Sequence, residues 1–315
     1  MNRLTIIGTG YVGTSIGLAL KERKGSFEIV GHDLEHSRAL EAKKLGAVDK
    51  AEWNLPAALE NARMVVVATP LNVMDKLFSQ MAEFLEPGCV VTDTASLKGP
   101  ALTWAERSFG SQVNYVGGNP IVGDSGEDRK PSSTLFQNRT YCVIAAPDAT
   151  TEAVDQVIRL VRALGAEPMF IDAVEHDSHM AAVGQMPSLV ATALVTIAAA
   201  NPSWRDGQRL AGPAFGAATG LTLQDPVEQR AQLQTNRELL LGWIQALQGQ
   251  LAEMGRLLEE DPDGLQKVLE AARDVRASWH PGIGPQVEGS PVELPRAREQ
   301  FSSWFLGGLG GRGRK

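Results

Sequence analysis

Residues 8–13 read Gly8-Thr9-Gly10-Tyr11-Val12-Gly13, and this G-x-G-x-x-G stretch decides the fold. A short apolar run with Leu4, Ile6 and Ile7 precedes it, and residues 14–20 continue with helical spacing. A second strand is expected over 28–31, and the carboxylate of Asp33 follows it, 20 positions after Gly13. A strand, a glycine turn, a helix and then a carboxylate are together typical of a dinucleotide-binding Rossmann unit.

Each glycine of this stretch has a separate expected role. Gly8 permits the tight turn, Gly10 lets a pyrophosphate approach the backbone, and Gly13 lets the helix pack close to the strand. The backbone amides at the helix start, around Tyr11 and Val12, then face the phosphates. A purely structural glycine turn is the alternative, but the surrounding pattern favours binding of a nicotinamide or similar dinucleotide.

The cofactor is expected to be NAD, with NADP as the alternative. A carboxylate at Asp33 accepts hydrogen bonds from the ribose hydroxyls of NAD and repels a 2′-phosphate. Ser37 and Arg38 are the residues that would favour NADP if their loop folded back onto that phosphate. Thr69 and Pro70 follow another apolar strand and are expected on the nicotinamide side.

Composition limits the class of protein. The chain has 315 residues, 43% of them hydrophobic, so two domains and a sizeable core are expected. Its net charge of −7 argues against nucleic acid as a partner, and the one basic cluster is the terminal segment 312–315. Cys89 and Cys142 lie in apolar runs and are expected to be buried thiols.

A cytoplasmic location without a membrane contact is expected. The chain enters its first strand at once, which leaves no room for a targeting peptide. The longest apolar stretch, residues 189–200, is about half of what a bilayer needs.

The order of segments predicts two domains and a tail. Up to residue 172, strand-like and helix-like segments alternate, with further strands at 64–68, 89–93, 114–116, 140–145 and 167–171. This alternation predicts an α/β Rossmann domain with a doubly wound, mostly parallel sheet. Residues 173–280 are predicted to form an all-α substrate and dimerisation domain, and residues 281–315 an irregular arm or tail.

The expected helices of the second domain cover 174–200, 203–213, 225–260 and 262–278. The segment 185–200 is apolar on nearly all faces, so we expect it to be buried, with a partner subunit completing a homodimer. Arg230 and Arg237 are seven positions apart in one expected helix and would therefore share a face.

Several motifs, taken together, resemble the prephenate and arogenate dehydrogenases of tyrosine biosynthesis. After the glycine stretch they are Ala68-Thr69-Pro70, Asp93-Thr94-Ala95-Ser96-Leu97-Lys98, Asn119-Pro120-Ile121-Val122-Gly123, Glu175-His176-Asp177 and Gln185-Met186-Pro187-Ser188. The resemblance covers about residues 1–260. It implies oxidative decarboxylation of a small-molecule substrate, in which a hydride passes to the nicotinamide and the ring aromatises.

The substrate motifs depart from the family pattern. Ser96 matches the family's assisting serine, but Asn119 stands where the family has its proton-accepting histidine. An amide is not a base near neutral pH. Residues 184–188 replace Ser-His-Leu-Pro-His without either histidine, and Thr219-Gly220 replaces the pair that carries the substrate-binding arginine.

Three interpretations of the pocket stay open. The catalytic candidates are Ser96, Asn119, Gln185 and Lys98, and Lys98 would serve as a base if burial favoured its uncharged amine. The enzyme could instead act on another small hydroxy acid, or the protein could be an inactive nucleotide-binding sensor.

The histidines near the predicted domain junction have an open role. His176 either faces the pocket or makes structural hydrogen bonds at the start of the long helix, and His179 is expected on the same helix face. No metal site is expected, because no ligand set of known spacing is present.

Overall fold

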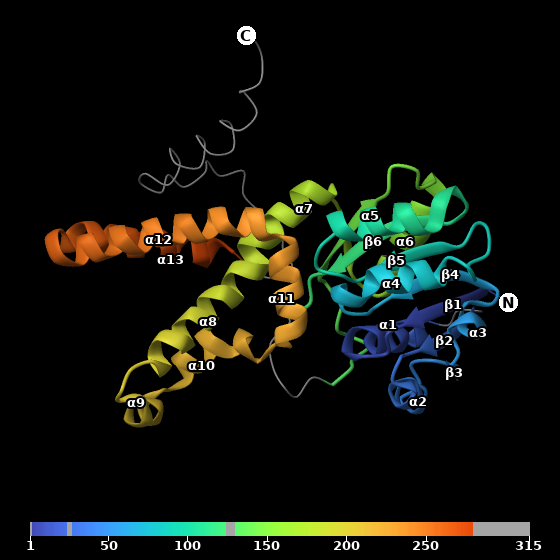
Figure 1. Ribbon diagram of the computed structural model, residues 1–315, viewed down its shortest axis with the longest axis horizontal. Helices are drawn as coiled ribbons and strands as arrows, with labels where there is room; N and C mark the ends of the chain where they lie inside the picture. The colour runs from blue at the N-terminus through green and yellow to red at the C-terminus, as the bar shows by residue number, and fades with distance from the viewer. Residues whose placement is uncertain (1, 24–26, 124–129, 280–315) are drawn as a thin grey trace, which may run out of the picture. The chain divides into compact units, whose positions relative to one another are not determined.

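The computed structural model describes residues 2–23, 27–123 and 130–279 (Figure 1). The chain divides into two compact units, Met1–Ile244 and Gln245–Lys315. The first unit contains one eight-stranded sheet in the order β3-β2-β1-β4-β5-β6-β7-β8. Its strands are β1 (Asn2–Ile7), β2 (Phe27–His32), β3 (Lys50–Glu52), β4 (Ala62–Val67), β5 (Val90–Asp93), β6 (Asn114–Pro120), β7 (Thr140–Ala145) and β8 (Glu167–Phe170).

The strand order confirms the predicted doubly wound fold. Strands β1 and β4 are parallel neighbours although β2 and β3 intervene in the chain, so the order reverses between them. Ligands of such sheets bind at this reversal, beyond the carboxyl ends of the strands. The sheet is parallel from β3 through β6, and β7 then pairs antiparallel with β6 and parallel with β8.

Helices cover both faces of the sheet because alternate strand residues point to opposite sides. Val66 belongs to a core cluster with helices α1 and α6, whereas Val65 and Val67 belong to a second cluster with α4 and α5. The helices of this part are α1 (Tyr11–Glu22), α2 (His36–Lys44), α3 (Leu55–Leu59), α4 (Leu71–Met81), α5 (Gly99–Phe109) and α6 (Thr151–Ala163). Cys89 and Cys142 are free and buried, as predicted, and desolvation raises the pKa of Cys89 to about 12.

The long helix after the sheet is continuous but not uniform. It consists of α7 (Ala173–Met180), a π-helical turn (Ala181–Gln185) and α8 (Met186–Ala199). The run is 27 residues long, and the most apolar 18-residue stretch within it has a mean hydropathy of 1.6, so the helix could cross a membrane by length and composition alone. The prediction that no segment reaches that length was therefore wrong, because it began the apolar stretch at residue 189 and left out the helix before it.

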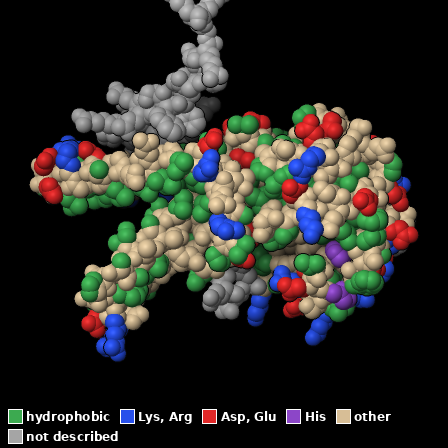
Figure 2. Space-filling view, in the orientation of Figure 1, with side chains coloured by type: hydrophobic (Ala, Val, Ile, Leu, Met, Phe, Trp, Pro, Cys, Tyr) green, Lys and Arg blue, Asp and Glu red, His purple; other side chains and the backbone are tan. Residues whose placement is uncertain are grey.

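The single chain covers little of residues 185–200, so their predicted burial against a partner subunit stays a prediction. Only 28% of the most apolar 18-residue stretch is buried inside the chain, and Val190, Leu194 and Ile197 are exposed. Apolar side chains are visible along this helix in Figure 2. The residues that do pack inward, Met186, Ser188 and Ala191, lie toward its start.

The later helices are shorter than predicted. The expected helix 203–213 ends earlier, as α9 (Trp204–Leu210), and a separate helix α10 (Pro213–Thr219) follows it. The expected helix 225–260 is two helices, α11 (Pro226–Thr235) and α12 (Arg237–Glu260). Arg230 and Arg237 therefore belong to different helices, and their separation of seven residues does not place them on one helix face.

The second unit contains the rest of α12 and the predicted last helix, α13 (Pro262–Ser278). Asp261 begins α13, and its carboxylate accepts the amide of Gly264 at 2.9 Å, a common N-terminal cap. The predicted arm 281–315 lies outside the described residues. The predicted domain boundary at residue 172 stays a prediction, since the compact first unit extends to Ile244.

Candidate functional site

The glycine turn joins β1 to α1 with no room for larger side chains at two positions. Gly8 has φ +89°, and a Cβ there would lie 2.4 Å from the carbonyl oxygen of Ala68. A Cβ on Gly13 would lie 1.9 Å from the carbonyl oxygen of Gly8. At Gly10 a Cβ would meet nothing within 4 Å, so this face of the turn is open. The turn therefore has the close packing and the open space that a bound pyrophosphate needs.

Asp33 is tied to the same turn. Its Oδ2 accepts the backbone amide of Thr9 at 2.8 Å and the Thr9 hydroxyl at 3.3 Å, and its Oδ1 accepts the amide of Glu35 at 3.0 Å. The carboxylate thus lies beside the glycine turn, as ribose recognition requires. Arg38, the residue considered for NADP, is held by two hydrogen bonds of 3.0 Å to Glu35.

Two buried hydroxyls follow neighbouring strands of the sheet. Thr69 follows β4 and Ser96 follows β5, and neither of their buried hydroxyl oxygens has a hydrogen-bond partner among the residues that the structure describes. Because β4 and β5 are parallel neighbours, both residues lie at the carboxyl edge where a ligand binds. Buried hydroxyls without partners are rare in proteins, which suggests that a ligand completes their hydrogen bonds.

Lys98 lies in the core. Its side chain is fully buried, forms an ion pair with Asp93 and donates to the carbonyl oxygen of Gly118 at 2.5 Å. Tyr115 donates its hydroxyl to the same carboxylate, and burial together with that charge raises the pKa of Tyr115 well above its usual value. This arrangement gives Lys98 a structural role in the core, so we do not assign it as a base.

Asn119, at the carboxyl end of β6, contacts a buried histidine, which in turn contacts a carboxylate. The Asn119 side-chain nitrogen lies 3.0 Å from His176 Nε2, and His176 Nδ1 lies 2.7 Å from Asp177 Oδ1. The Asp177 carboxylate also accepts the backbone amides of Lys98 and Gly99, at 2.8 and 2.9 Å. His176 thus makes buried hydrogen bonds at the start of the long helix, one of its two predicted roles.

Gln185 is buried at the end of the π-helical turn. Its Oε1 accepts the side chain of Asn236 at 2.8 Å, and its Nε2 donates to the carbonyl oxygen of Gln232 at 3.1 Å. Asn236 also donates to the carbonyl oxygen of Asp177 at 2.9 Å. Asn236, between α11 and α12, therefore holds the helix that carries His176 in place. The sequence did not predict this link, because residues 225–260 have helical spacing throughout.

His179 does not share the surroundings of His176. Its side chain is 65% exposed and its Nε2 lies 3.6 Å from the Glu175 carboxylate, whereas His176 is 2% exposed. Both histidines belong to α7, three positions apart as predicted, but only His176 is buried against other side chains. Among the residues that the structure describes, no group of three or more His, Cys, Asp or Glu side chains could hold a metal ion.

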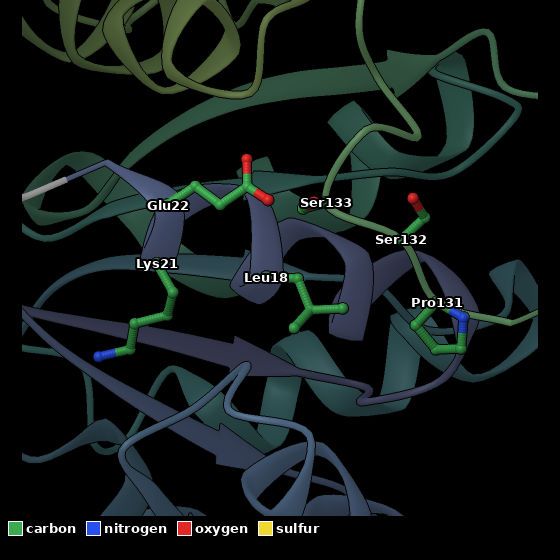
Figure 3. A pocket seen from close by; sticks show the side chains of 6 residues that line it. All are labelled: Leu18, Lys21, Glu22, Pro131, Ser132 and Ser133. Carbon is green, nitrogen blue, oxygen red and sulfur yellow. The ribbon is translucent and has the colours of Figure 1, made fainter.

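A surface hollow lies beside α1 but away from the glycine turn (Figure 3). It is lined by Leu18, Lys21 and Glu22 from the end of α1 and by residues 131–133. Lys21 is already paired with Asp49 at 2.5 Å. The dinucleotide pattern points to the opposite, N-terminal end of α1, so the hollow is not the candidate site.

Comparison with known proteins identifies the family. Residues 16–169 match the nucleotide-binding domain of prephenate dehydrogenase, and residues 172–271 match the dimerization domain of the same enzyme. The chain belongs to the prephenate dehydrogenase family. A prephenate dehydrogenase of Lactococcus lactis is 27% identical over 305 residues, which cover 94% of this chain and 83% of that enzyme.

Solved structures show the same fold at lower identity. The structure of prephenate dehydrogenase from A. aeolicus in complex with hydroxyphenyl propionate and NAD+ has a TM-score of 0.80 and 22% identity, covering 88% of this chain and 98% of that one. An arogenate dehydrogenase of Synechocystis has a TM-score of 0.72 and 21% identity, covering 87% and 99%. The prephenate dehydrogenase fold therefore extends through both matched domains.

Proposed function

We propose that this chain is an NAD-dependent dehydrogenase that oxidises a ring hydroxyl in a substrate of the prephenate or arogenate type. The glycine turn with Asp33 beside it, in a chain whose residues 16–169 match a prephenate dehydrogenase nucleotide-binding domain, is the observation that carries the proposal. The similar A. aeolicus enzyme is a complex with NAD+, which supports the same cofactor here.

The residues of the turn would hold the cofactor. Gly8 and Gly13 allow the tight packing of the turn, Gly10 leaves space for the pyrophosphate beside the amides of Tyr11 and Val12, and Asp33 would accept the ribose hydroxyls. Bound NAD supplies the hydride acceptor. Thr69 and Pro70, directly after β4, would line its nicotinamide side.

The substrate would meet neutral polar groups. Ser96 has a hydroxyl without a protein partner and can bond a substrate oxygen, and Asn119 can accept a hydrogen bond from a substrate hydroxyl but cannot take its proton. Gln185 would support the site without contacting the substrate, because both ends of its amide are already bonded to protein groups.

We also propose a cytoplasmic homodimer. The matched dimerization domain supports the dimer, and the exposed apolar side chains of α8 provide a surface that a second copy would cover. A dimer contact of this kind would explain why α8 is apolar, because a second copy and not a lipid bilayer would cover its side chains. Sedimentation in detergent-free buffer tests this, and a chain recovered only in membranes would contradict it.

An absorbance assay at the reduced-nicotinamide band tests the proposed activity. The purified protein is mixed with NAD and, separately, with prephenate, arogenate and a panel of small hydroxy acids. Turnover with prephenate or arogenate supports the proposal, whereas turnover only with another hydroxy acid transfers the activity to that substrate. Nucleotide binding without any turnover would make the protein a sensor.

Replacing Asp33 by Ala should weaken NAD binding and shift preference toward NADP. The change removes an acceptor for the ribose hydroxyls and the negative charge that repels a 2′-phosphate. We expect about a tenfold loss of NAD affinity, the value of roughly one hydrogen bond to a charged group. Titration calorimetry with both nucleotides measures it, and Glu41→Ala, which removes an exposed carboxylate of α2 and keeps both Asp33 and the Glu35–Arg38 pair, is the matched control. Unchanged affinity for both nucleotides would refute the ribose assignment.

Replacing Ser96 by Ala should lower turnover by roughly tenfold and leave NAD affinity unchanged, because one hydrogen bond to the substrate is lost. Steady-state kinetics and calorimetry on the same preparation separate the two effects. Ser79→Ala on the exposed side of α4 is the control and should change neither quantity. Equal turnover of the Ser96 variant and the unmodified enzyme would mean that the substrate pocket lies elsewhere.

A further inference from the structure

The side chain of Asn119 stands at the position of the family's histidine, and its orientation decides what the pocket offers a substrate. An amide presents either an acceptor oxygen or a donor NH₂ group, depending on which way it is turned. Asn119 is 5% exposed and its amide nitrogen lies 3.0 Å from His176 Nε2. His176 is therefore the group that selects the orientation.

The partners of His176 determine where its proton lies. Its Nδ1 is 2.7 Å from Asp177 Oδ1, and a carboxylate can only accept, so Nδ1 carries the hydrogen. In the neutral ring Nε2 then has a lone pair and must accept. It accepts from the Asn119 amide nitrogen, which leaves the Asn119 oxygen to face away from the histidine.

Asp177 holds the end of this chain of hydrogen bonds in place. Its carboxylate accepts two backbone amides at the start of α5, from Lys98 and Gly99. The positive end of the α5 dipole and these two donors favour the charged carboxylate. Asn236, bonded to the carbonyl oxygen of Asp177, holds the same turn of α7 from the other side.

We propose that His176 is a positioning residue that holds Asn119 with its Oδ1 toward the substrate hydroxyl. No donor among the described residues bonds that oxygen, so it is available to a ligand. This inference rests on the proposed function, because it is the dehydrogenase reaction that needs an acceptor for the hydroxyl hydrogen.

Two substitutions separate this role from a merely structural one. In His176→Asn the amide can still reach Asp177, as Nδ1 does, but nothing replaces Nε2. In His176→Gln the longer side chain can place an acceptor oxygen where Nε2 was. His179→Asn, on the exposed side of the same helix, is the matched control.

The experiment measures kcat and KM at pH 7.5 for the four proteins, with NAD affinity by calorimetry. We expect about a tenfold rise in KM for His176→Asn, the value of one misdirected hydrogen bond. His176→Gln should stay within about threefold of the unmodified enzyme, because its amide oxygen replaces the acceptor. All four should bind NAD alike. If His176→Asn and His179→Asn behave identically, or if His176→Gln loses as much as His176→Asn, the inference is wrong.

A spectroscopic measurement decides the point even if a variant does not fold. Nitrogen-15 spectra of histidine-labelled protein distinguish a neutral ring with hydrogen on Nδ1 from the other tautomer. Hydrogen on Nε2 in the neutral ring of His176 would overturn the inference. Absence of turnover in the unmodified protein would overturn the proposed function instead, and the spectra would still decide the Asn119 orientation.

Discussion

Replacement of Lys98 by Met is expected to destabilise the protein strongly. The methionine fills a similar volume but leaves the Asp93 carboxylate without its cation in a fully buried site. Removing one partner of a buried ion pair costs about 3–5 kcal/mol, because the remaining charge is neither solvated nor paired. Thermal unfolding should therefore shift down by on the order of 10 °C for a domain of this size.

The exposed pair Lys21–Asp49 provides the control for Lys98→Met. Its side chains are 32% and 42% exposed, so Lys21→Met should cost about 1 kcal/mol or less. The double variant Lys98→Met with Asp93→Asn tests the cause, since it removes both charges. It should recover part of the lost stability. If Lys98→Met unfolds at the same temperature as the unmodified protein, the charge of Asp93 is stabilised by Tyr115 and backbone amides alone.

The Rossmann strands were predictable because most of them are continuous apolar runs buried on both faces. Val65, Val66 and Val67 need no periodicity to be recognised as a central parallel strand. Strand β3 was not predicted, because Lys50-Ala51-Glu52 is a short, mostly polar edge segment. Its strand conformation comes from pairing with β2, which the local sequence does not encode.

The break between α11 and α12 could not be read from the sequence. Residues 225–260 have helical spacing throughout, and the interruption at Asn236 depends on its bonds to Gln185 and to the carbonyl oxygen of Asp177. Those partners are more than fifty positions away in the chain. A lone asparagine between two helix-forming segments was the only local signal.

The candidate site was predictable in its residue types but not in its pairings. The family motifs identified Ser96, Asn119 and Gln185 as candidates by their positions in the sequence. They did not predict which side chains contact one another. Asp93 was visible as a carboxylate ending an apolar strand, and only the fold shows that it neutralises Lys98. The contact of Asn119 with His176 joins residues 57 positions apart and follows from the packing of α7 against the sheet edge.

Replacement of Gly10 by Ala is expected to abolish most NAD binding without changing stability. A Cβ at this position meets no protein atom within 4 Å, and Gly10 has the extended backbone, φ −70° and ψ −160°, that any residue adopts. The added methyl group therefore affects only a ligand that approaches the turn. If the pyrophosphate lies against Gly10, the clash should weaken NAD by about 10- to 100-fold, the cost of about 1–3 kcal/mol for an overpacked contact.

Gly212→Ala is the matched control, because Gly212 also begins a helix in an extended conformation with nothing within 4 Å of its Cβ position. The free energy of unfolding of both variants should lie within about 0.5 kcal/mol of that of the unmodified protein, as it does for surface substitutions. Only Gly10→Ala should lose affinity in a calorimetric titration with NAD. Equal affinities for the two variants would place the pyrophosphate away from this turn, and the dinucleotide assignment would then lose its structural basis.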